Sequence, residues 1–123
     1  MNKIIIVIIS LALLTSCGEN LGNRVDTKNL KVYYLESVPK DLAIEFTEFW
    51  RDNDFVGDSP QYIQLDKEND LYIVRLIEKE KYHGTPLSIE EQGKLNELER
   101  TLSKQIFKKR TIIEITDNTF REL

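Results

Sequence analysis

The side chains that could perform chemistry are few and widely spaced. His83 is the only imidazole in the chain, and the carboxylates to consider with it are Asp54 and Asp58. A histidine that acts as a general base needs an orienting partner and a nucleophile within hydrogen-bond reach. The sequence identifies neither partner beside His83, which it places in a loop. We therefore predict no catalytic residues and a protein that is not an enzyme.

The acidic segment at 52–58 is the stretch that looks most like a cation-binding loop. A calcium loop needs an oxygen ligand at its fifth position and a glutamate at its twelfth. Val56 and Ile63 stand at those positions, so the pattern fails. One Cys and one His also exclude a Cys/His zinc cage. We expect no metal and no cofactor.

The charge balance excludes one class of partner. The chain has 17 basic and 21 acidic side chains, which gives a formal net charge of −4. Phosphate backbones are bound by clustered lysines and arginines. Nucleic acid is therefore not an expected partner.

The N-terminal segment has the features of an export signal. Lys3 precedes an apolar run over residues 4–14. This run is too short to cross a bilayer, which takes about 20 apolar residues. A positive end, a short apolar stretch and small residues after it are typical of a secretory signal peptide.

The residues after the run specify the kind of signal. Leu14-Thr15-Ser16-Cys17 resembles the lipobox of bacterial lipoproteins. The resemblance implies that Cys17 receives a lipid, that a peptidase removes residues 1–16, and that fatty acyl chains such as palmitate hold the protein at a membrane. The resemblance places the protein in the cell envelope. Because no Asp follows Cys17, it favours the outer membrane, on its periplasmic or surface face, if the cell has two membranes. The alternatives are a buried hydrophobic element with a chance cysteine and an uncleaved signal anchor.

The remaining chain divides into a linker and one domain. Residues 17–29 have two glycines, three asparagines and no apolar period, so we predict a flexible tether. Residues 30–123 form a single expected α+β domain. Its predicted elements are a strand at 31–36, a helix from Pro39 to about Asn53, strands at 61–65 and 71–77, a helix opened by the Ser88–Glu91 capping box, and a strand at 111–116.

This order is β-α-β-β-α-β, which predicts the ferredoxin-like two-layer sandwich. Two right-handed crossovers would place both helices on one face of a four-stranded antiparallel sheet with strand order 4-1-3-2. The chain from Val32 onward also resembles a small, uncharacterised bacterial α+β module. The segments that carry this resemblance are 38–43, 53–58, 62–65 and 114–120. The resemblance supports the fold and supplies no chemistry.

The sheet face away from the helices is the candidate site. Alternation along the strands, with Arg75 taken as pointing outward, assigns a mixed aromatic, apolar and charged set to this face. The assigned residues are Tyr34, Glu36, Tyr62, Ile73, Arg75, Ile112 and Glu114. Such a group of side chains often marks a contact surface. The alternative is an open sheet that only carries a cross-strand pair between Arg75 and a carboxylate.

These observations predict a lipid-anchored interaction or accessory module of the cell envelope. Its expected partners are the membrane, through the lipid on Cys17, and either an envelope protein or a second copy of itself. The alternative function is a small-ligand-binding protein or a hydrolytic enzyme that uses His83 and nearby carboxylates.

Overall fold

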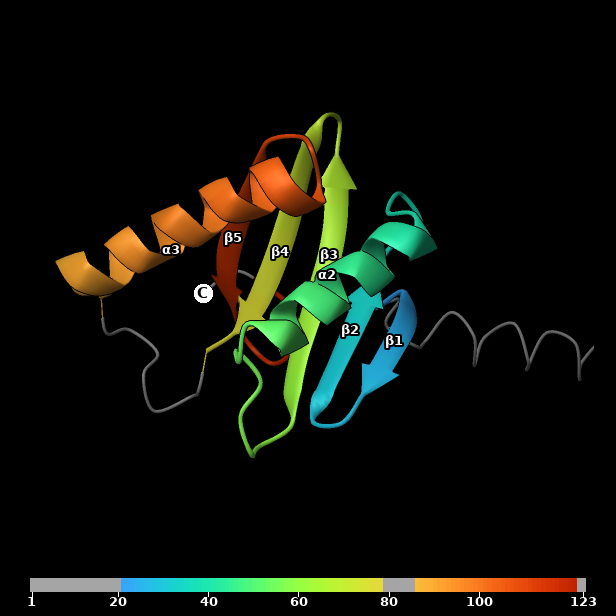
Figure 1. The fold of residues 1–123 in the computed structure, drawn as a ribbon, viewed down its shortest axis with the longest axis horizontal. Helices are drawn as coiled ribbons and strands as arrows, with labels where there is room; N and C mark the ends of the chain where they lie inside the picture. Colours follow the sequence, from blue (N-terminus) through green and yellow to red (C-terminus); the bar gives the residue numbers. More distant parts are fainter. Residues whose placement is uncertain (1–20, 79–85, 122–123) are drawn as a thin grey trace, which may run out of the picture.

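The computed structural model describes residues 21–78 and 86–121 (Figure 1). The predicted signal segment with Cys17 and the residue His83 lie outside these ranges. The described elements follow one another along the chain as β1 (Asn23–Thr27), β2 (Leu30–Tyr34), α2 (Lys40–Asp52), β3 (Gln61–Glu68), β4 (Leu71–Ile77), α3 (Ile89–Thr101), the π-helix η2 (Leu102–Ile106) and β5 (Thr111–Thr116).

The sheet has five strands in the order β1-β2-β3-β4-β5, and it is mixed. β1 pairs with β2 and β3 with β4 in antiparallel fashion, whereas β2 pairs with β3 and β4 with β5 in parallel. The prediction of a four-stranded antiparallel ferredoxin-like sandwich with order 4-1-3-2 is therefore wrong. Each helix connects two strands that are direct neighbours, so no strand is inserted between them.

The handedness of the connections explains this error. Both helices cover the same face of the sheet, because both contribute to one hydrophobic core (Figure 1). The two connections advance in the same direction across the sheet, although β3 and β4 run antiparallel. With both helices on one face, one of the two connections must be left-handed. About 98% of such connections are right-handed, and the prediction applied that rule to both.

β1 lies inside the segment predicted to be a flexible tether. It forms a hairpin with β2, in which Arg24 pairs with Tyr33 and Val25 with Val32. The chain enters β1 through Gly22, whose φ is 98°, and a Cβ there would collide with the carbonyl oxygen of Tyr34. This close approach requires glycine. The tether prediction is therefore wrong for the strand residues.

Several local predictions are confirmed. β5 begins and ends where the sequence placed it, and β3 and β4 form the predicted antiparallel hairpin. Ser88 caps α3: its hydroxyl oxygen accepts a hydrogen bond from the Glu91 backbone N–H, and the Glu91 carboxylate accepts one from the Ser88 backbone N–H. This reciprocal capping satisfies donors that the first helical turn leaves free.

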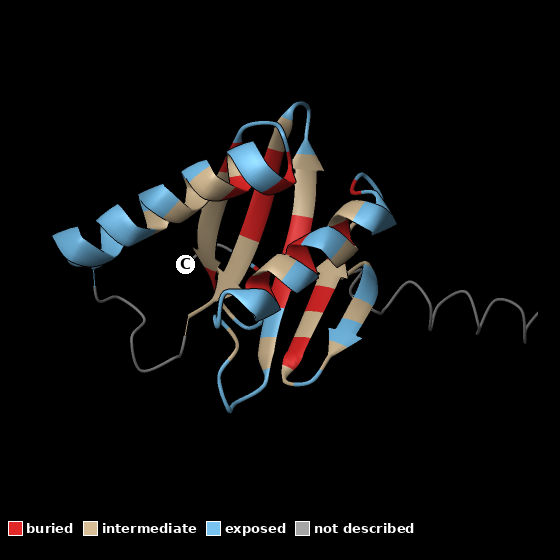
Figure 2. Ribbon diagram, in the orientation of Figure 1, coloured by how far each residue is buried: buried red, intermediate tan, exposed pale blue. Residues whose placement is uncertain are grey.

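The core lies between the helices and the inward side of the sheet, where Figure 2 shows the buried bands of α2 and the central strands. Phe46 of α2 is fully buried and stacks on Trp50 with ring centroids 5.3 Å apart. Phe107, which follows η2, lies 6.0 Å from Phe46 and 4.7 Å from Tyr72 of β4. These rings join α2 and the segment after η2 to the sheet. In the described part of the chain both helices lie on this face, and the opposite face has no helical layer.

Candidate functional site

The outer face is defined here as the sheet face opposite the two helices. The strand registers assign to it Lys31, Tyr33, Tyr62, Gln64, Asp66, Ile73, Arg75, Ile77, Ile112 and Glu114. One row crosses the whole sheet, because Arg24, Tyr33, Gln64, Arg75 and Glu114 lie opposite one another in successive strands. Polar side chains therefore occupy the middle of this face.

Arg75 is the centre of that row. Its Nε donates to Glu114 Oε1 at 3.0 Å, and its Nη1 donates to Gln64 Oε1 at 2.9 Å and to Asp66 Oδ2 at 3.0 Å. The side chains of Arg75 and Asp66 are each 15% exposed, and that of Glu114 is 20% exposed. Burial alone would lower the pKa of Arg75, but the hydrogen bonds to Glu114 and Asp66 outweigh it and raise the pKa. This side chain is therefore engaged within the domain.

The two ends of the described chain cover part of the outer face. Gln64 Nε2 donates to the backbone oxygen of Leu21 at 3.2 Å, and Gln64 is buried. After β5 the chain turns back, and the buried ring of Phe120 packs edge-on against Tyr33 at 5.9 Å. Phe120 holds a φ of 62°, which a bulky residue rarely adopts. The surface left for a partner is thus smaller than an open sheet would offer.

Asp117 organises the turn that carries Phe120. Its Oδ1 accepts hydrogen bonds from the Thr119 hydroxyl at 2.6 Å, the Thr119 backbone N–H at 2.8 Å and the Arg121 backbone N–H at 3.1 Å. The Thr119 hydroxyl contributes most to lowering the pKa of Asp117, followed by the backbone donors of Arg121 and Thr119.

We expect the turn to be acid-sensitive. A carboxyl whose pKa is lowered in the folded state stabilises the fold above its ordinary pKa of about 3.9. That contribution is lost as the pH falls through the lowered value. Replacing Thr119 with alanine removes the hydroxyl donor that contributes most to lowering the pKa of Asp117. This pKa should therefore rise toward its ordinary value. A carboxyl NMR titration measures this directly, and an Asp117 midpoint that Thr119→Ala leaves unchanged would refute the assignment.

The structure places most of the predicted face residues as expected. Tyr62, Ile73, Arg75, Ile112 and Glu114 all lie on the outer face. Ile73 is 3% exposed, however, so it is not available as a contact residue.

Two of the predicted face residues lie elsewhere. Tyr34 is 7% exposed and belongs to the core beneath the helices, so its assignment to the outer face is wrong. The alternation of Leu30, Val32 and Tyr34 toward the core is the signal that could have placed Tyr33 outward instead. Glu36 is exposed but follows the end of β2, outside the sheet.

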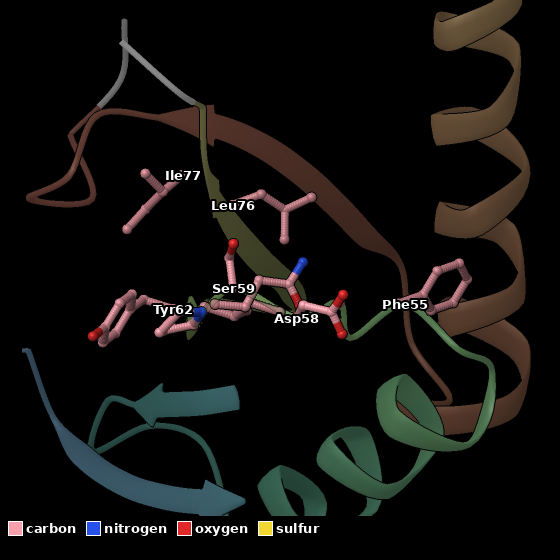
Figure 3. Close-up of a pocket in the computed structure, with 10 residues that line it drawn as sticks. Phe55, Asp58, Ser59, Tyr62, Leu76 and Ile77 are labelled. Carbon is pink, nitrogen blue, oxygen red and sulfur yellow. The ribbon is translucent and has the colours of Figure 1, made fainter. Parts of the chain in front are cut away.

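A cavity of about 510 Å³ lies where the loop after α2 meets the start of β3 and the end of β4 (Figure 3). Its lining comprises Phe55, Gly57, Asp58, Ser59, Pro60, Gln61, Tyr62, Ile63, Leu76 and Ile77, and we call it the Tyr62 cavity. Figure 3 shows Tyr62 and Phe55 at opposite ends, with Leu76 and Ile77 along one wall. Tyr62 is 39% exposed and Phe55 40% exposed, so two aromatic rings are accessible at its rim.

Hydrogen bonds hold the loop that forms the cavity wall. Gln61 Oε1 accepts from Trp50 Nε1 at 3.1 Å, which ties the loop end to the core side of α2. The Gln61 backbone N–H donates to the Asn29 backbone oxygen at 2.9 Å, and the Asn29 amide donates to the Gly57 oxygen at 3.4 Å. The cavity wall is therefore held by contacts that the loop and the start of β3 make with α2 and with the turn between β1 and β2. Local sequence patterns do not encode such contacts, which is why the sequence did not reveal it.

The chemistry of the Tyr62 cavity favours binding. Apolar walls combined with a few polar groups are typical of sites for small molecules or inserted side chains. Asp58 adds a carboxylate at the loop, and Asp52 and Asp54 precede it in the same segment. Within residues 21–78 and 86–121, no group of three or more His, Cys, Asp or Glu could hold a metal ion. In the same ranges neither helix has the length and apolar character needed to cross a bilayer.

Comparison with known proteins supports a coarse classification. A family model described as a family N-terminal domain matches residues 24–123, and this description names no activity. The match fits the expected small module of unassigned function. Comparison with curated proteins gave no match, and comparison with solved structures gave none. Because the matched span covers well over half of the chain, the chain belongs to this family of N-terminal domains.

Proposed function

We propose that this protein is a non-catalytic module that binds a partner protein through the Tyr62 cavity and the adjoining outer face. Lipid on Cys17 holds the module at a membrane of the cell envelope. The observation that carries the proposal is the Tyr62 cavity itself, which lies beside exposed aromatic rings and an acidic loop. Among the described residues that line the cavity, none is a histidine, a cysteine or a lysine. Binding is therefore preferred to catalysis.

The lining specifies the chemistry of the partner. Leu76, Ile77 and Phe55 offer an apolar surface for one or two inserted side chains. The carboxylate of Asp58 and the phenol of Tyr62 can accept hydrogen bonds at the polar rim. The matching partner is an extended segment in which an apolar or aromatic residue neighbours a lysine or arginine. Charge complementarity of this kind guides association and partner choice.

The lipid anchor rests on the resemblance of residues 14–17 to a lipobox, and those residues lie outside the described ranges. Replacing Cys17 with alanine removes the thiol that would be acylated. We expect wild-type protein to sediment with membranes and to resist alkaline extraction, and the Cys17→Ala protein to lose that association. Equal membrane association of the two proteins would contradict lipid anchoring through this residue.

The cavity itself is tested by crosslinking in intact cells. Tyr62→Ala shortens the rim, and Asp58→Asn removes the negative charge without changing the size of the side chain. We expect each change to reduce the yield of one crosslinked species, identified by mass spectrometry, by about tenfold, equivalent to about 1.4 kcal/mol. Asp54→Asn is the matched control, because it removes the same charge from the same loop but from a residue that does not line the cavity. A yield that falls equally for all three variants would contradict the proposal.

A second candidate is a small-molecule site in the same cavity. Its volume of about 510 Å³ lies within the range of about 300–1,000 Å³ that such sites commonly have. An amphipathic amine such as 2-phenylethylamine matches an apolar wall with a carboxylate at the rim. Chemical-shift changes at Tyr62 and Ile77 on addition of this amine, abolished by Asp58→Asn, together with the absence of any crosslinked protein, would favour this candidate.

A further inference from the structure

The outward edge of β5 has an unusual arrangement of hydrogen bonds. β5 ends the sheet, and in its parallel ladder with β4 alternate residues direct their backbone groups away from β4. The backbone N–H of Ile113 donates to Glu99 Oε2 at 2.7 Å, and that of Thr111 donates to the Ser103 hydroxyl at 3.0 Å. Side chains from α3 and η2 thus occupy donors that a further strand would otherwise use.

The position of α3 leaves room beside this edge. Figure 1 shows α3 crossing β5 and extending beyond it, past the edge of the sheet. Every residue from Pro86 to Lys94 is exposed, and α3 has no buried residue, whereas α2 has four. Leu87 is 37% exposed and Ile89 is 94% exposed. A sixth strand next to β5 would lie near this uncovered part of the helix.

From these observations we infer that the β5 edge is a strand-addition surface for a second copy of this chain. We also infer that the hydrogen bond from Ile113 N–H to the Glu99 carboxylate, which we call the latch, opposes this pairing. Edge strands are common sites of such pairing, and proteins guard them with charged side chains. The inference concerns a surface other than the Tyr62 cavity, so it stands or falls independently of the proposed function.

The sequence of β5 is suited to pairing with itself. An antiparallel pair with its twofold axis at Ile113 places Thr111 opposite Ile115 of the second copy and Ile112 opposite Glu114. Beyond the ends of the strand, Lys109 lies opposite Asp117 of the second copy. No two like charges lie opposite each other between residues 109 and 117 in this register. The strand is also rich in isoleucine and threonine, which favour sheets.

The energetic role of the latch follows from its charge. A hydrogen bond from a backbone N–H to a carboxylate is stronger than one between neutral groups. A symmetric dimer must open two such latches before the two edges can pair. Removing the carboxylate should therefore favour the dimer by about tenfold per latch, or about 100-fold in its dissociation constant.

Sedimentation velocity of the full-length chain in mild detergent, over a range of concentrations, provides the test. We expect Glu99→Ala to lower the dimer dissociation constant about 100-fold relative to wild type, and Glu99→Gln, which keeps an oxygen acceptor, to lower it less. Glu97→Ala is the matched control, because it removes an exposed carboxylate from the same helix and should behave like wild type.

Hydrogen exchange at the Ile113 amide distinguishes pairing from simple opening. In Glu99→Ala this amide should become more protected as the protein concentration rises. An amide that exchanges faster at all concentrations, with no dimer, would overturn the inference. A monomer in which the same amide gains protection would also overturn it, because another segment of the same chain would then be pairing with β5.

Discussion

Replacing Arg75 with alanine is expected to lower the free energy of unfolding by about 2–4 kcal/mol, which is a large part of the stability of a small domain. The change leaves the Asp66 and Glu114 carboxylates, only 15% and 20% exposed, without the cation that holds them. Desolvated charges without a partner are costly, and this cost exceeds the value of the hydrogen bonds themselves. Urea denaturation at pH 7 measures the loss.

Arg51 provides the matched control for this substitution. It contacts Asp52 at 3.3 Å, but the two side chains are 53% and 66% exposed. An exposed pair contributes little, so Arg51→Ala should change the free energy of unfolding by less than about 1 kcal/mol. Equal losses for the two variants would show that the polar row on the outer face is not a structural element.

Replacing Phe46 with alanine is expected to lower the free energy of unfolding by about 3–5 kcal/mol. Phe46 is fully buried, and its ring meets Trp50 of its own helix and Phe107 after η2. The substitution would leave a cavity at the place where both helices and the sheet meet. Urea denaturation at pH 7 measures this loss of free energy of unfolding as well.

Phe49 on α2 is the comparison for Phe46. It is only half-buried, and its ring contacts that of the exposed Phe55, with the centroids 6.3 Å apart. Phe49→Ala should therefore cost about 1–2 kcal/mol. A loss as large as that of Phe46→Ala would mean that the core is centred nearer the loop after α2 than the burial of Phe46 indicates.

Local structure could be predicted well from the sequence, because its causes are local. The Ser88–Glu91 box joins residues three apart by two reciprocal hydrogen bonds, and a run of β-branched isoleucine and threonine marks β5. The two apolar runs around the turn at Asn69 form the predicted hairpin, and Asn69 takes a φ of 56° there. Asparagine tolerates that conformation better than most residues.

Topology could not be predicted, because strand neighbours are chosen by packing over long distances. The right-handed rule fails for one of the two connections here, and no local pattern at 30–68 or 71–116 signals which. β1 was missed because Arg24 and Asp26 make the strand polar. None of its residues is buried, so its sequence lacks the apolar alternation that marks β2.

The candidate site was predicted only in part. The position of Arg75 on the outer face follows from alternation along β4. The predicted strand order did not make the strands of Arg75 and Glu114 neighbours, so their pairing in the structure was not predicted. The inward and outward faces of β2 were assigned the wrong way round, so Tyr34 was placed on the outer face instead of Tyr33. The loop that builds the Tyr62 cavity is held by Trp50, Asn29 and Gln61, which lie far apart in the sequence. The Tyr62 cavity therefore exists only once the whole domain has folded.

The proposal that the Tyr62 cavity grips a partner protein has a direct test in living cells. A photoreactive amino acid is placed at position 62 on the cavity rim and, in a second protein, at Glu48 on the exposed side of α2. The two positions lie on opposite sides of the domain, and both variants should fold, since both residues are exposed.

On irradiation, position 62 should yield one defined protein adduct that Asp58→Asn diminishes and Asp54→Asn does not, while position 48 yields no such adduct. The same adduct from both positions, or an adduct from position 62 that Asp58→Asn leaves unchanged, would contradict binding through the Tyr62 cavity.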